Sequence, residues 1–600
     1  MKKILDLITA EMKSAFTGCG YEESYAKVVL SNRPDLCEYQ CNGAMAAAKA
    51  YKKKPIDIAN EVVAALTERS RSQAAAGQTP VFAEDGVQAV MPGFINLKVN
   101  PQYAADYMNG MQAAPKYGVE EAGHGETIIV DYGGANVAKP LHVGHLRSAV
   151  IGESIKRMGK FLGYDMIGDV HLGDWGLQMG LIIEELRDRK PELVYFDESY
   201  TGEFPKEPPF TISELEDIYP TASGKSKEDP AFKERAQLAT YKLQHGYAPF
   251  LAIWKHIMSV SLADLKRNYD NLDVHFELWK GESDAEEFIP WLIQDLKDKG
   301  LARESQGALV VDIAEPTDSK ELPPCIVQKS DGAALYATSD LGTILQRERD
   351  YQPVKYIYIT DKRQELHFTQ VFRVAKKAGY VRPEMPMIHI GFGTMNGKDG
   401  KPFKTRDGGV MRLEHLIADI NEAVYNRIME NRTVSEEEAR DTAKIVGLAA
   451  LKYGDLTNQA AKDYVFDLDR FISFEGNTGP YILYTIVRIK SILSRYQEAG
   501  GAAAQGSILP PAGDGEKALM LELAKYNEVM ETAFAETAPH KICQYIFDLA
   551  NAFNSFYHDN RILSEEDKAR QSSWIQLITL VKDVLETCIQ VLGFGAPEKM

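Results

Sequence analysis

The chain has 600 residues, of which 44% are hydrophobic and 26% are charged, and its formal net charge is −18. This charge excludes a protein coated in basic residues for non-specific nucleic-acid binding, although a local basic stripe can still hold RNA. No window approaches the roughly 18 apolar residues that a membrane span needs, and Asp6 and Glu11 interrupt any apolar signal core. We therefore expect a cytoplasmic protein of several domains with no membrane contact.

The first 118 residues are predicted to form a small α/β domain. Its expected elements are, in order, helices over residues 1–15, 43–50 and 57–69 and a strand over residues 93–99. A charged, Gly-rich stretch at residues 120–126 then separates this domain from the next strand.

From Thr127 the pattern changes to strands that alternate with helices. The expected elements are a strand at 127–130, a helix at 146–162, and strands at 166–170, 355–360 and 387–390, with a helix at 365–378 before the last strand. Buried strands alternating with helices predict a doubly wound parallel sheet of the Rossmann-like type. Ligands bind such sheets at the carboxyl ends of the strands, where His142, Asp361 and Gly391 are expected to lie.

The two halves of this sheet are far apart in the sequence. Residues 185–330 between them read as an insertion with helical patterns, and the chain becomes mostly helical after about residue 415. We therefore predict a catalytic domain over residues 119–465, which contains the insertion, and a helical domain over residues 466–600.

The turn between the first strand of the sheet and its helix is the most informative segment. It places His142 and His145 at the start of a helix, three residues apart and therefore near one face. Free backbone N–H groups at a helix N-terminus favour phosphate, so this turn predicts a site for a nucleoside triphosphate. Two histidines could also suggest a metal, but no third ligand lies at a suitable spacing, and we predict no metal site.

Two further segments follow strands of the predicted sheet. Gly173-Asp-Trp-Gly176 is either a shaped pocket wall or a core aromatic residue beside a turn. The loop at residues 393–409 is rich in glycine and in cations, and we expect it to close over phosphates. Its cations are Lys398, Lys401, Lys404 and Arg406.

These residues together resemble the class I aminoacyl-tRNA synthetases, and specifically the arginyl-tRNA synthetases of bacterial type. His142-Val-Gly-His145 matches the "HIGH" signature of the class, and the longer run from Ala135 to Ser148 is more specific to the arginine enzymes. Further matching runs, spread over nearly the whole chain, are Gly173–Gly176, Gly281–Ser283, Tyr336–Asp340, Phe474–Tyr481 and Ala596–Met600.

The resemblance implies ATP-dependent activation of L-arginine and its transfer to the 3′ end of tRNA(Arg), with Mg²⁺ accompanying ATP. It implies His142, His145, Lys139 and Lys404 as catalytic residues, and His142, Gly144, His145, Lys404 and Arg406 as the ATP site. It implies an arginine site made by Gly134, Ala135, Asn136, His145, Tyr336, Asp340 and Gln364. Asp340 is the first choice for the guanidinium partner and Glu282 the second, because a guanidinium needs fixed acceptors.

The resemblance also assigns the terminal domains. The N-terminal domain is similar to one that touches the tRNA elbow, and the helical C-terminal domain resembles an anticodon-binding bundle. Tyr481, Tyr484 and Arg488 lie at helical spacing there, and they either stack on splayed bases or form a helix-packing face. By resemblance we expect a monomer.

The chain departs from the family pattern at two places. Phe403-Lys-Thr-Arg406 stands where the "KMSKS" loop usually lies, and Lys139, just before "HIGH", is in the place of the lysine that compensates in such members. Gly134-Ala135 replaces a usual Ser-Pro, and Ser339 replaces a usual Arg. Three alternatives stay open: another class I synthetase, such as one for cysteine or glutamate; a non-translational adenylyltransferase; and a catalytically silent, synthetase-like RNA-binding protein.

Overall fold

A computed structural model of the protein describes residues 1–330, 335–403, 411–430, 434–501 and 506–600. These residues divide into two compact units. The first contains residues 1–121, 481–589 and 596–600, and the second contains residues 122–480 and 590–595. Among the described helices, none combines the length and the apolar composition that crossing a membrane requires.

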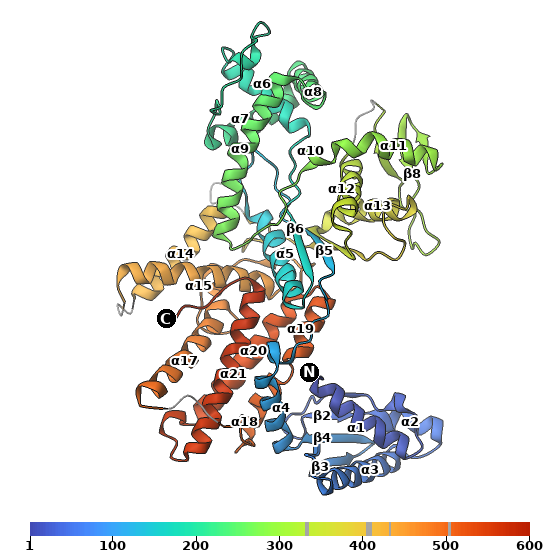
Figure 1. The fold of residues 1–600 in the computed structure, drawn as a ribbon, viewed down its shortest axis with the longest axis vertical. Coiled ribbons are helices and arrows are strands. Elements are labelled where there is room, and N and C mark those ends of the chain that lie inside the picture. Colours follow the sequence, from blue (N-terminus) through green and yellow to red (C-terminus); the bar gives the residue numbers. More distant parts are fainter. Residues whose placement is uncertain (331–334, 404–410, 431–433, 502–505) are drawn as a thin grey trace. The chain divides into compact units, whose positions relative to one another are not determined.

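The N-terminal part of the first unit is a four-stranded antiparallel sheet with helices (Figure 1). Its strands, in spatial order, are β1 (Val28–Leu30), β2 (Tyr39–Cys41), β4 (Phe94–Val99) and β3 (Phe82–Val90). Its helices are α1 (Ile4–Gly18), α2 (Gly43–Tyr51), α3 (Pro55–Ala75) and α4 (Pro101–Ala113). The three predicted helices and the strand at 93–99 are present, and the structure adds β1, β2, β3 and α4.

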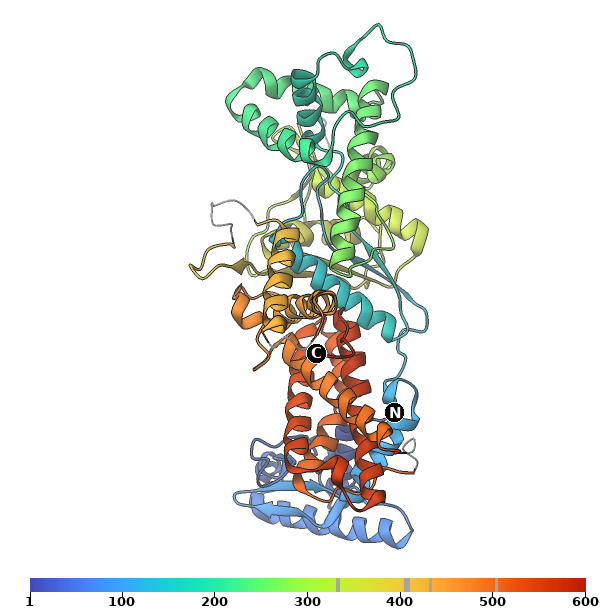
Figure 2. The ribbon, with the colours of Figure 1, turned by 90° about the vertical axis from the view of Figure 1, so that its left-hand side faces the viewer.

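The C-terminal part of the first unit is a bundle of helices that run beside one another (Figures 1 and 2). They are α17 (Gly479–Glu498), which begins in the second unit, α18 (Asp514–Leu523), α19 (Tyr526–Ala535), α20 (Pro539–Asp559) and α21 (Lys568–Leu592). Apolar side chains at helical spacing, such as Ile542, Ile546 and Leu549 on α20, are fully buried and hold the bundle together.

The second unit is built on a parallel four-stranded sheet with the strand order β11-β10-β5-β6. The strands are β5 (Thr127–Asp131), β6 (Asp165–Asp169), β10 (Lys355–Asp361) and β11 (Met387–Phe392). α5 (Val143–Phe161) connects β5 to β6, while α12 (Tyr336–Tyr351) precedes β10 and α13 (Glu365–Lys377) connects β10 to β11. The predicted fold class, a doubly wound parallel sheet with an N-terminal α/β part and a C-terminal helical part, is confirmed.

The buried runs of these strands explain the sheet. Residues 356–359 of β10 are all buried, and residues 128–131 of β5 are buried beside them. A hydrophobic cluster joins α11 (Ile289–Asp298), α12 and α13 to β10, and its members Leu292, Leu341, Val371 and Tyr356 are fully buried. Strands that are buried on both faces carry near-continuous apolar runs, as these do.

Long segments are inserted between β6 and β10. They comprise α6 (Leu177–Arg189), α7 (Ile212–Glu228), α8 (Pro230–Gln244), α9 (Ala248–Asn271), α10 (Glu282–Ala285) and α11, followed by the antiparallel strands β7 (Ala302–Ser305), β8 (Ala308–Val311) and β9 (Cys325–Gln328). After β11 come β12 (Met395–Asn396), α14 (Leu413–Met429), α15 (Glu436–Leu456), β13 (Tyr464–Val465) and α16 (Leu468–Phe471). The division into three domains stays a prediction.

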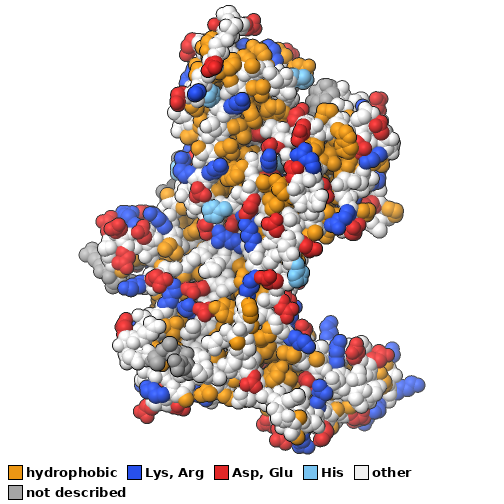
Figure 3. Space-filling view, in the orientation of Figure 1, with side chains coloured by type: hydrophobic (Ala, Val, Ile, Leu, Met, Phe, Trp, Pro, Cys, Tyr) orange, Lys and Arg blue, Asp and Glu red, His pale blue; other side chains and the backbone are white. Residues whose placement is uncertain are grey.

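Acidic, basic and hydrophobic side chains are interspersed on the face of the molecule shown in Figure 3. The net charge of −18 is therefore not gathered in one acidic region of that face.

Candidate active site

The strand order places a switch point beside β5. The chain leaves β5 through α5 toward β6 on one side, whereas β10 pairs with the other side of β5. The carboxyl edge of the strands at such a switch point is where ligands bind in open α/β sheets. The segment at 132–142 after β5, the segment at 170–176 after β6 and the residues after β10 all begin at this edge.

His142 and His145 cap the first turn of α5. The backbone N–H of Gly144 donates to Nδ1 of His142 at 3.0 Å, and the backbone N–H of His142 donates to Nδ1 of His145 at 3.2 Å. The two rings lie 4.1 Å apart between centroids. Because both Nδ1 atoms accept hydrogen bonds, the proton of each neutral ring is on Nε2, and both Nε2–H groups are left as donors.

Both imidazoles are held neutral. Burial lowers the pKa of His142, and the charge of Lys139 lowers it further. Burial lowers the pKa of His145 to about 3, and the nearby His142 and Lys139 add to this shift. At neutral pH the turn therefore presents two uncharged N–H donors and the lysine ammonium, whose Nζ lies 4.5 Å from the centre of the Tyr219 ring.

Gly134, Ala135 and Asn136 form the floor between the ends of β5 and β6. The N–H of Gly173 donates to the carbonyl of Ala135 at 3.0 Å, and the N–H of Gly134 donates to the carbonyl of Val170 at 3.1 Å. Gly134 has a φ of +55°, and a Cβ on Gly173 would lie 2.2 Å from Oδ1 of Asn136. The Asn136 amide therefore packs directly on the backbone of the Gly173–Gly176 turn, and this contact requires a glycine there.

Asp340 is the fifth residue of α12, just after its first turn, and lies between two imidazoles. His367 Nε2 is 2.5 Å from Oδ2 of Asp340, and His171 Nε2 is 3.5 Å from Oδ1. The Asp340 side chain is 14% exposed. Burial alone would lower the pKa of His171, but the carboxylates of Asp131 and Asp340 raise it above its ordinary value. Sequence reasoning identified Asp340 but missed both histidines.

Glu282 adds a second carboxyl group to this side of the site. Burial raises the pKa of Glu282 to about 7; the charges of Asp174 and Asp340 add to the shift, and His171 opposes it. Asp174 accepts hydrogen bonds from the backbone and hydroxyl of Ser283 at 3.0 and 2.6 Å. These bonds fix the Gly281–Ser283 segment beside the Gly173–Gly176 turn. Glu282 lies near enough to Asp340 for the charge of Asp340 to act on it, and we call these two carboxyl groups the acidic slot.

A buried arginine lies beneath the slot. Arg347 of α12 is 1% exposed and donates to Asp131 at 2.7 Å and to Asp169 at 2.8 Å, the last residues of β5 and β6. A buried guanidinium needs such carboxylate partners. Sequence reasoning missed Arg347. Its partners Asp169 and Asp131 precede it by 178 and 216 residues, and nothing in the local pattern of α12 relates it to them.

Two further residues predicted for the arginine site, Tyr336 and Gln364, are exposed. Tyr336 is 72% exposed at the start of α12; burial of part of its ring raises its pKa, and Glu282 and Tyr219 add to the shift. Its hydroxyl therefore lies near both Glu282 and Tyr219. Gln364 is exposed at the end of the short helix that follows β10.

The cation-rich loop after β11 is described only in part. Lys404 and Arg406 lie outside the described residues. The segment that resumes at Met411 is bonded to the histidine turn: the N–H of Val143 donates to the carbonyl of Met411 at 3.1 Å, and the N–H of Leu413 donates to that of Leu141 at 3.0 Å.

The predicted tRNA contacts form a cluster in the first unit. Arg488 donates to Asn554 Oδ1 at 2.7 Å and to the hydroxyl of Tyr484 at 3.2 Å, and its guanidinium lies 4.8 Å from the Tyr484 ring. Tyr481 donates to Asn551 Oδ1 at 2.6 Å. Tyr481 and Arg488 thus take part in packing α17 on α20, while Tyr484 is 40% exposed.

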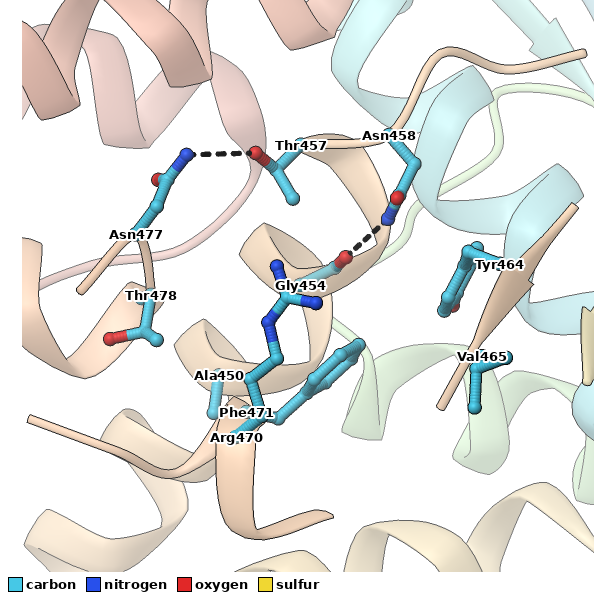
Figure 4. Close-up of a pocket in the computed structure, with 11 residues that line it drawn as sticks. Ala450, Gly454, Thr457, Asn458, Tyr464, Val465, Arg470, Phe471, Asn477 and Thr478 are labelled. Carbon is cyan, nitrogen blue, oxygen red and sulfur yellow. Dashed lines mark hydrogen bonds between the residues drawn. The ribbon is translucent and has the colours of Figure 1, made fainter. Parts of the chain in front are cut away.

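A cavity of about 120 Å³ lies elsewhere in the second unit, between the end of α15 and the Phe474–Tyr481 run (Figure 4). Arg470, Phe471 and Tyr464 line it, and Asn477 donates to Thr457 Oγ1 on its wall at 3.5 Å. No residue assigned to ATP or arginine lines this cavity.

Comparison with protein families matches three consecutive parts of the chain. Residues 110–468 match the family described as "tRNA synthetases class I (R), catalytic domain". Residues 2–99 match "Arginyl tRNA synthetase N terminal domain", and residues 482–600 match "DALR anticodon binding domain".

Whole proteins and solved structures match over similar lengths. The chain is 60% identical to the arginine–tRNA ligase of Agathobacter rectalis and 54% identical to that of Alkaliphilus oremlandii, in each case over 100% of both chains. The arginyl-tRNA synthetase structure from Plasmodium falciparum shares its fold at 24% identity, with a TM-score of 0.81 over 100% of both chains. That from Thermus thermophilus gives a TM-score of 0.75 at 21% identity, covering 99% of this chain and 100% of the other. The chain therefore belongs to the arginyl-tRNA synthetase family of class I aminoacyl-tRNA synthetases.

Proposed function

We propose that this protein is an arginine–tRNA ligase, which activates L-arginine with ATP and transfers it to the 3′ end of tRNA(Arg). Its family supports the reaction, and one observation in the structure supports the assignment of the site. Two neutral imidazoles at a helix N-terminus and a partly buried acidic slot lie at the same carboxyl edge of one sheet. A triphosphate and a guanidino acid could react where such groups meet.

The phosphate side consists of His142, His145, Gly144 and Lys139. The Nε2–H groups of the two histidines would bind phosphate oxygens. The backbone N–H groups of Val143, Gly144 and His145 already donate within the protein, so the expected backbone donors of this helix start are taken. Lys139 would add a positive charge next to the β- and γ-phosphates, and we assign Lys404 and Arg406 of the loop to the same phosphates. Donors placed in advance where charge develops lower the barrier without reorganisation of the protein.

The arginine side consists of the acidic slot and its floor. The carboxylate of Asp340, with Glu282 beside it, would bind the guanidinium, which is planar and always charged. Asn136, Gln364 and the backbone of residues 134–135 would hold the amino acid's α-amino and carboxylate groups, with Tyr336 closing the slot.

The chemistry then has two steps. A carboxylate oxygen of arginine attacks the α-phosphorus, the bond from that phosphorus to the bridging oxygen breaks, and pyrophosphate leaves with arginyl-adenylate remaining. The 2′-hydroxyl of the terminal tRNA ribose next attacks the arginyl carbonyl, and AMP leaves. The protein contributes chiefly position and charge.

Three further assignments rest on the proposed arginine–tRNA ligase activity. Mg²⁺ enters as the ATP complex, because this ion keeps several waters and is usually held by substrate phosphates. The tRNA anticodon contacts the helical bundle near Tyr481, Tyr484 and Arg488. The protein acts as a monomer in the cytoplasm.

ATP–pyrophosphate exchange with each of the twenty amino acids, with and without tRNA(Arg), tests the proposal. We expect exchange with arginine alone among the twenty. Exchange with another amino acid would assign a different class I synthetase, and tRNA binding without any exchange or aminoacylation would assign a silent RNA-binding protein.

A further inference from the structure

We propose that Arg147 is a positioning residue for the ATP side of this site, holding the first turn of α5 to the segment that leaves β11. The inference rests on the proposed function of His142 and His145. Arg147 follows His145 by two residues on α5 and touches none of the groups assigned to substrate.

The guanidinium of Arg147 joins three separate segments. Its Nε donates to both oxygens of Asp455 on α15, at 3.0 and 3.2 Å. Its Nη1 donates to the carbonyl of Gly393 at 2.8 Å and to the carbonyl of Lys462 at 2.9 Å. Its charge also lies 5.0 Å from the centre of the Tyr464 ring. Arg147 is 1% exposed, so all of these contacts are made away from water.

The segments that Arg147 joins are themselves bonded to each other. We call residues 393–396 the loop base. The N–H of Gly393 donates to the carbonyl of Ala460 at 2.9 Å, and the N–H of Tyr464 donates to the carbonyl of Thr394 at 3.1 Å. Asp463 accepts from the N–H of Thr394 and from Lys362, each at 2.7 Å. The loop base is thus fixed to residues 460–464 on one side and to α5 through Arg147 on the other.

The packing around the loop base leaves no room for a side chain at position 393. A Cβ there would lie 2.5 Å from Oδ1 of Asp463 and 2.5 Å from the carbonyl of Lys462. The close approach allows the two carbonyls that Arg147 bridges to face one guanidinium. Lysine keeps the charge of arginine but has no planar fork, so it cannot replace four directed bonds.

Arg147 is connected to the ATP side of the site, and not to the arginine side, through the N-terminal end of α5. Arg147 follows His142 by five residues and His145 by two, so all three lie at the N-terminal end of α5, and this end carries both Nε2–H donors. Movement of this end relative to the sheet edge would displace both donors together, and a misplacement of about 1 Å can cost roughly 10²-fold in rate. The acidic slot is built from α12 and the Gly281–Ser283 segment, which Arg147 does not contact.

The test compares Arg147→Lys with Arg157→Lys, a matched variant on the same helix. Arg157 also binds a carboxylate and a carbonyl, Glu153 at 2.9 Å and Asp273 at 2.8 Å, but it does not contact the loop base. Thermal unfolding reports the structural cost of each change. Exchange kinetics report KM for ATP, KM for arginine and kcat, and calorimetry reports the dissociation constant of ATP without arginine.

We expect Arg147→Lys to lower kcat/KM for ATP by roughly 10-fold or more while KM for arginine stays within about twofold. Arg157→Lys should lower the unfolding temperature without changing either constant. Equal changes in both KM values, or unchanged ATP constants in Arg147→Lys, would overturn the inference. Wild-type protein without arginine-dependent exchange would instead defeat the proposed function, and ATP binding by the variants would still test the position of Arg147.

A second variant covers the case in which Arg147→Lys does not fold. Asp463 is half-exposed, and Asp463→Asn weakens its bond to Thr394 without opening the buried cluster. The same selective loss for ATP, smaller in size, is expected in Asp463→Asn. ATP constants equal to those of the wild type in this variant would count against a positioning role for the loop base.

Discussion

Replacement of Asp340 by asparagine tests the acidic slot, because it removes the charge and keeps the shape. In the wild-type protein the Asp340 carboxylate is 14% exposed, so little water would compete for the guanidinium. A hydrogen bond to a charged group contributes about 1.5–3 kcal/mol, and loss of one partner of a buried ion pair costs about 3–5 kcal/mol. Asp340 is only partly buried, so we take the value where the two ranges meet, about 3 kcal/mol, as the free energy lost in Asp340→Asn.

That free energy corresponds to an increase of roughly 10²-fold in KM for arginine. KM for ATP should stay within about twofold, because the residues that we assign to ATP, His142 and His145, belong to another element. Asp318→Asn is the matched control: Asp318 also binds a cationic partner, Arg373 at 2.7 Å, but away from the strand ends. It should leave both constants unchanged.

Citrulline makes the measurement specific to charge, since its ureido group has nearly the shape of a guanidinium without the charge. Exchange kinetics with arginine and citrulline, in the wild-type protein and in Asp340→Asn, form a double-mutant cycle. We expect a coupling free energy of about 2–3 kcal/mol between Asp340 and the guanidinium charge. A coupling below about 0.5 kcal/mol, or a KM for arginine that does not change in Asp340→Asn, would refute the assignment of Asp340.

Three further outcomes are expected. The pKa of Glu282 is raised to about 7, so its carboxylate is protonated below that pH. KM for arginine should therefore fall as the pH rises from 6 to 8, and Glu282→Gln should flatten this profile. An identical profile in the variant would exclude Glu282 from the arginine site. Lys139→Ala should lower kcat/KM for ATP by roughly 10-fold or more, whereas Lys160→Ala, on the surface of α5, should not; equal activity of both variants would remove Lys139 from the phosphate site. Tyr484→Ala should raise KM for tRNA roughly fivefold or more, from the 1–3 kcal/mol of a lost base stack, and an unchanged tRNA KM in charging assays would leave Tyr484 as a packing residue only.

Much of the catalytic fold could be predicted from the sequence because its signals are local. β5 and β10 are apolar runs, and α5 begins at a turn whose residue types cap a helix, so a strand, a turn and a helix followed from adjacent residues. By contrast, β1 and β2 have three residues each, which is too short to show the alternation that identifies a strand.

The missed residues of the site depend on contacts between distant segments. Arg347 binds Asp131 and Asp169, and His171 reaches Asp340, only after the sheet has brought β5, β6 and α12 together. The protonation of the histidine pair was equally hidden, since burial and the Lys139 charge lower both pKa values. The roles of His142, Asp340 and the other site residues stay predictions until substrates are bound or residues replaced.

The structure of the protein with a non-hydrolysable arginyl-adenylate analogue tests most directly whether the histidine pair and Asp340 belong to one active site. We expect one analogue molecule to span the sheet edge, with the group that replaces the phosphate within hydrogen-bond distance of the Nε2 atoms of His142 and His145. Its guanidinium should contact the carboxylate of Asp340. A guanidinium bound away from Asp340, or an analogue that leaves both histidines without contact, would contradict the account.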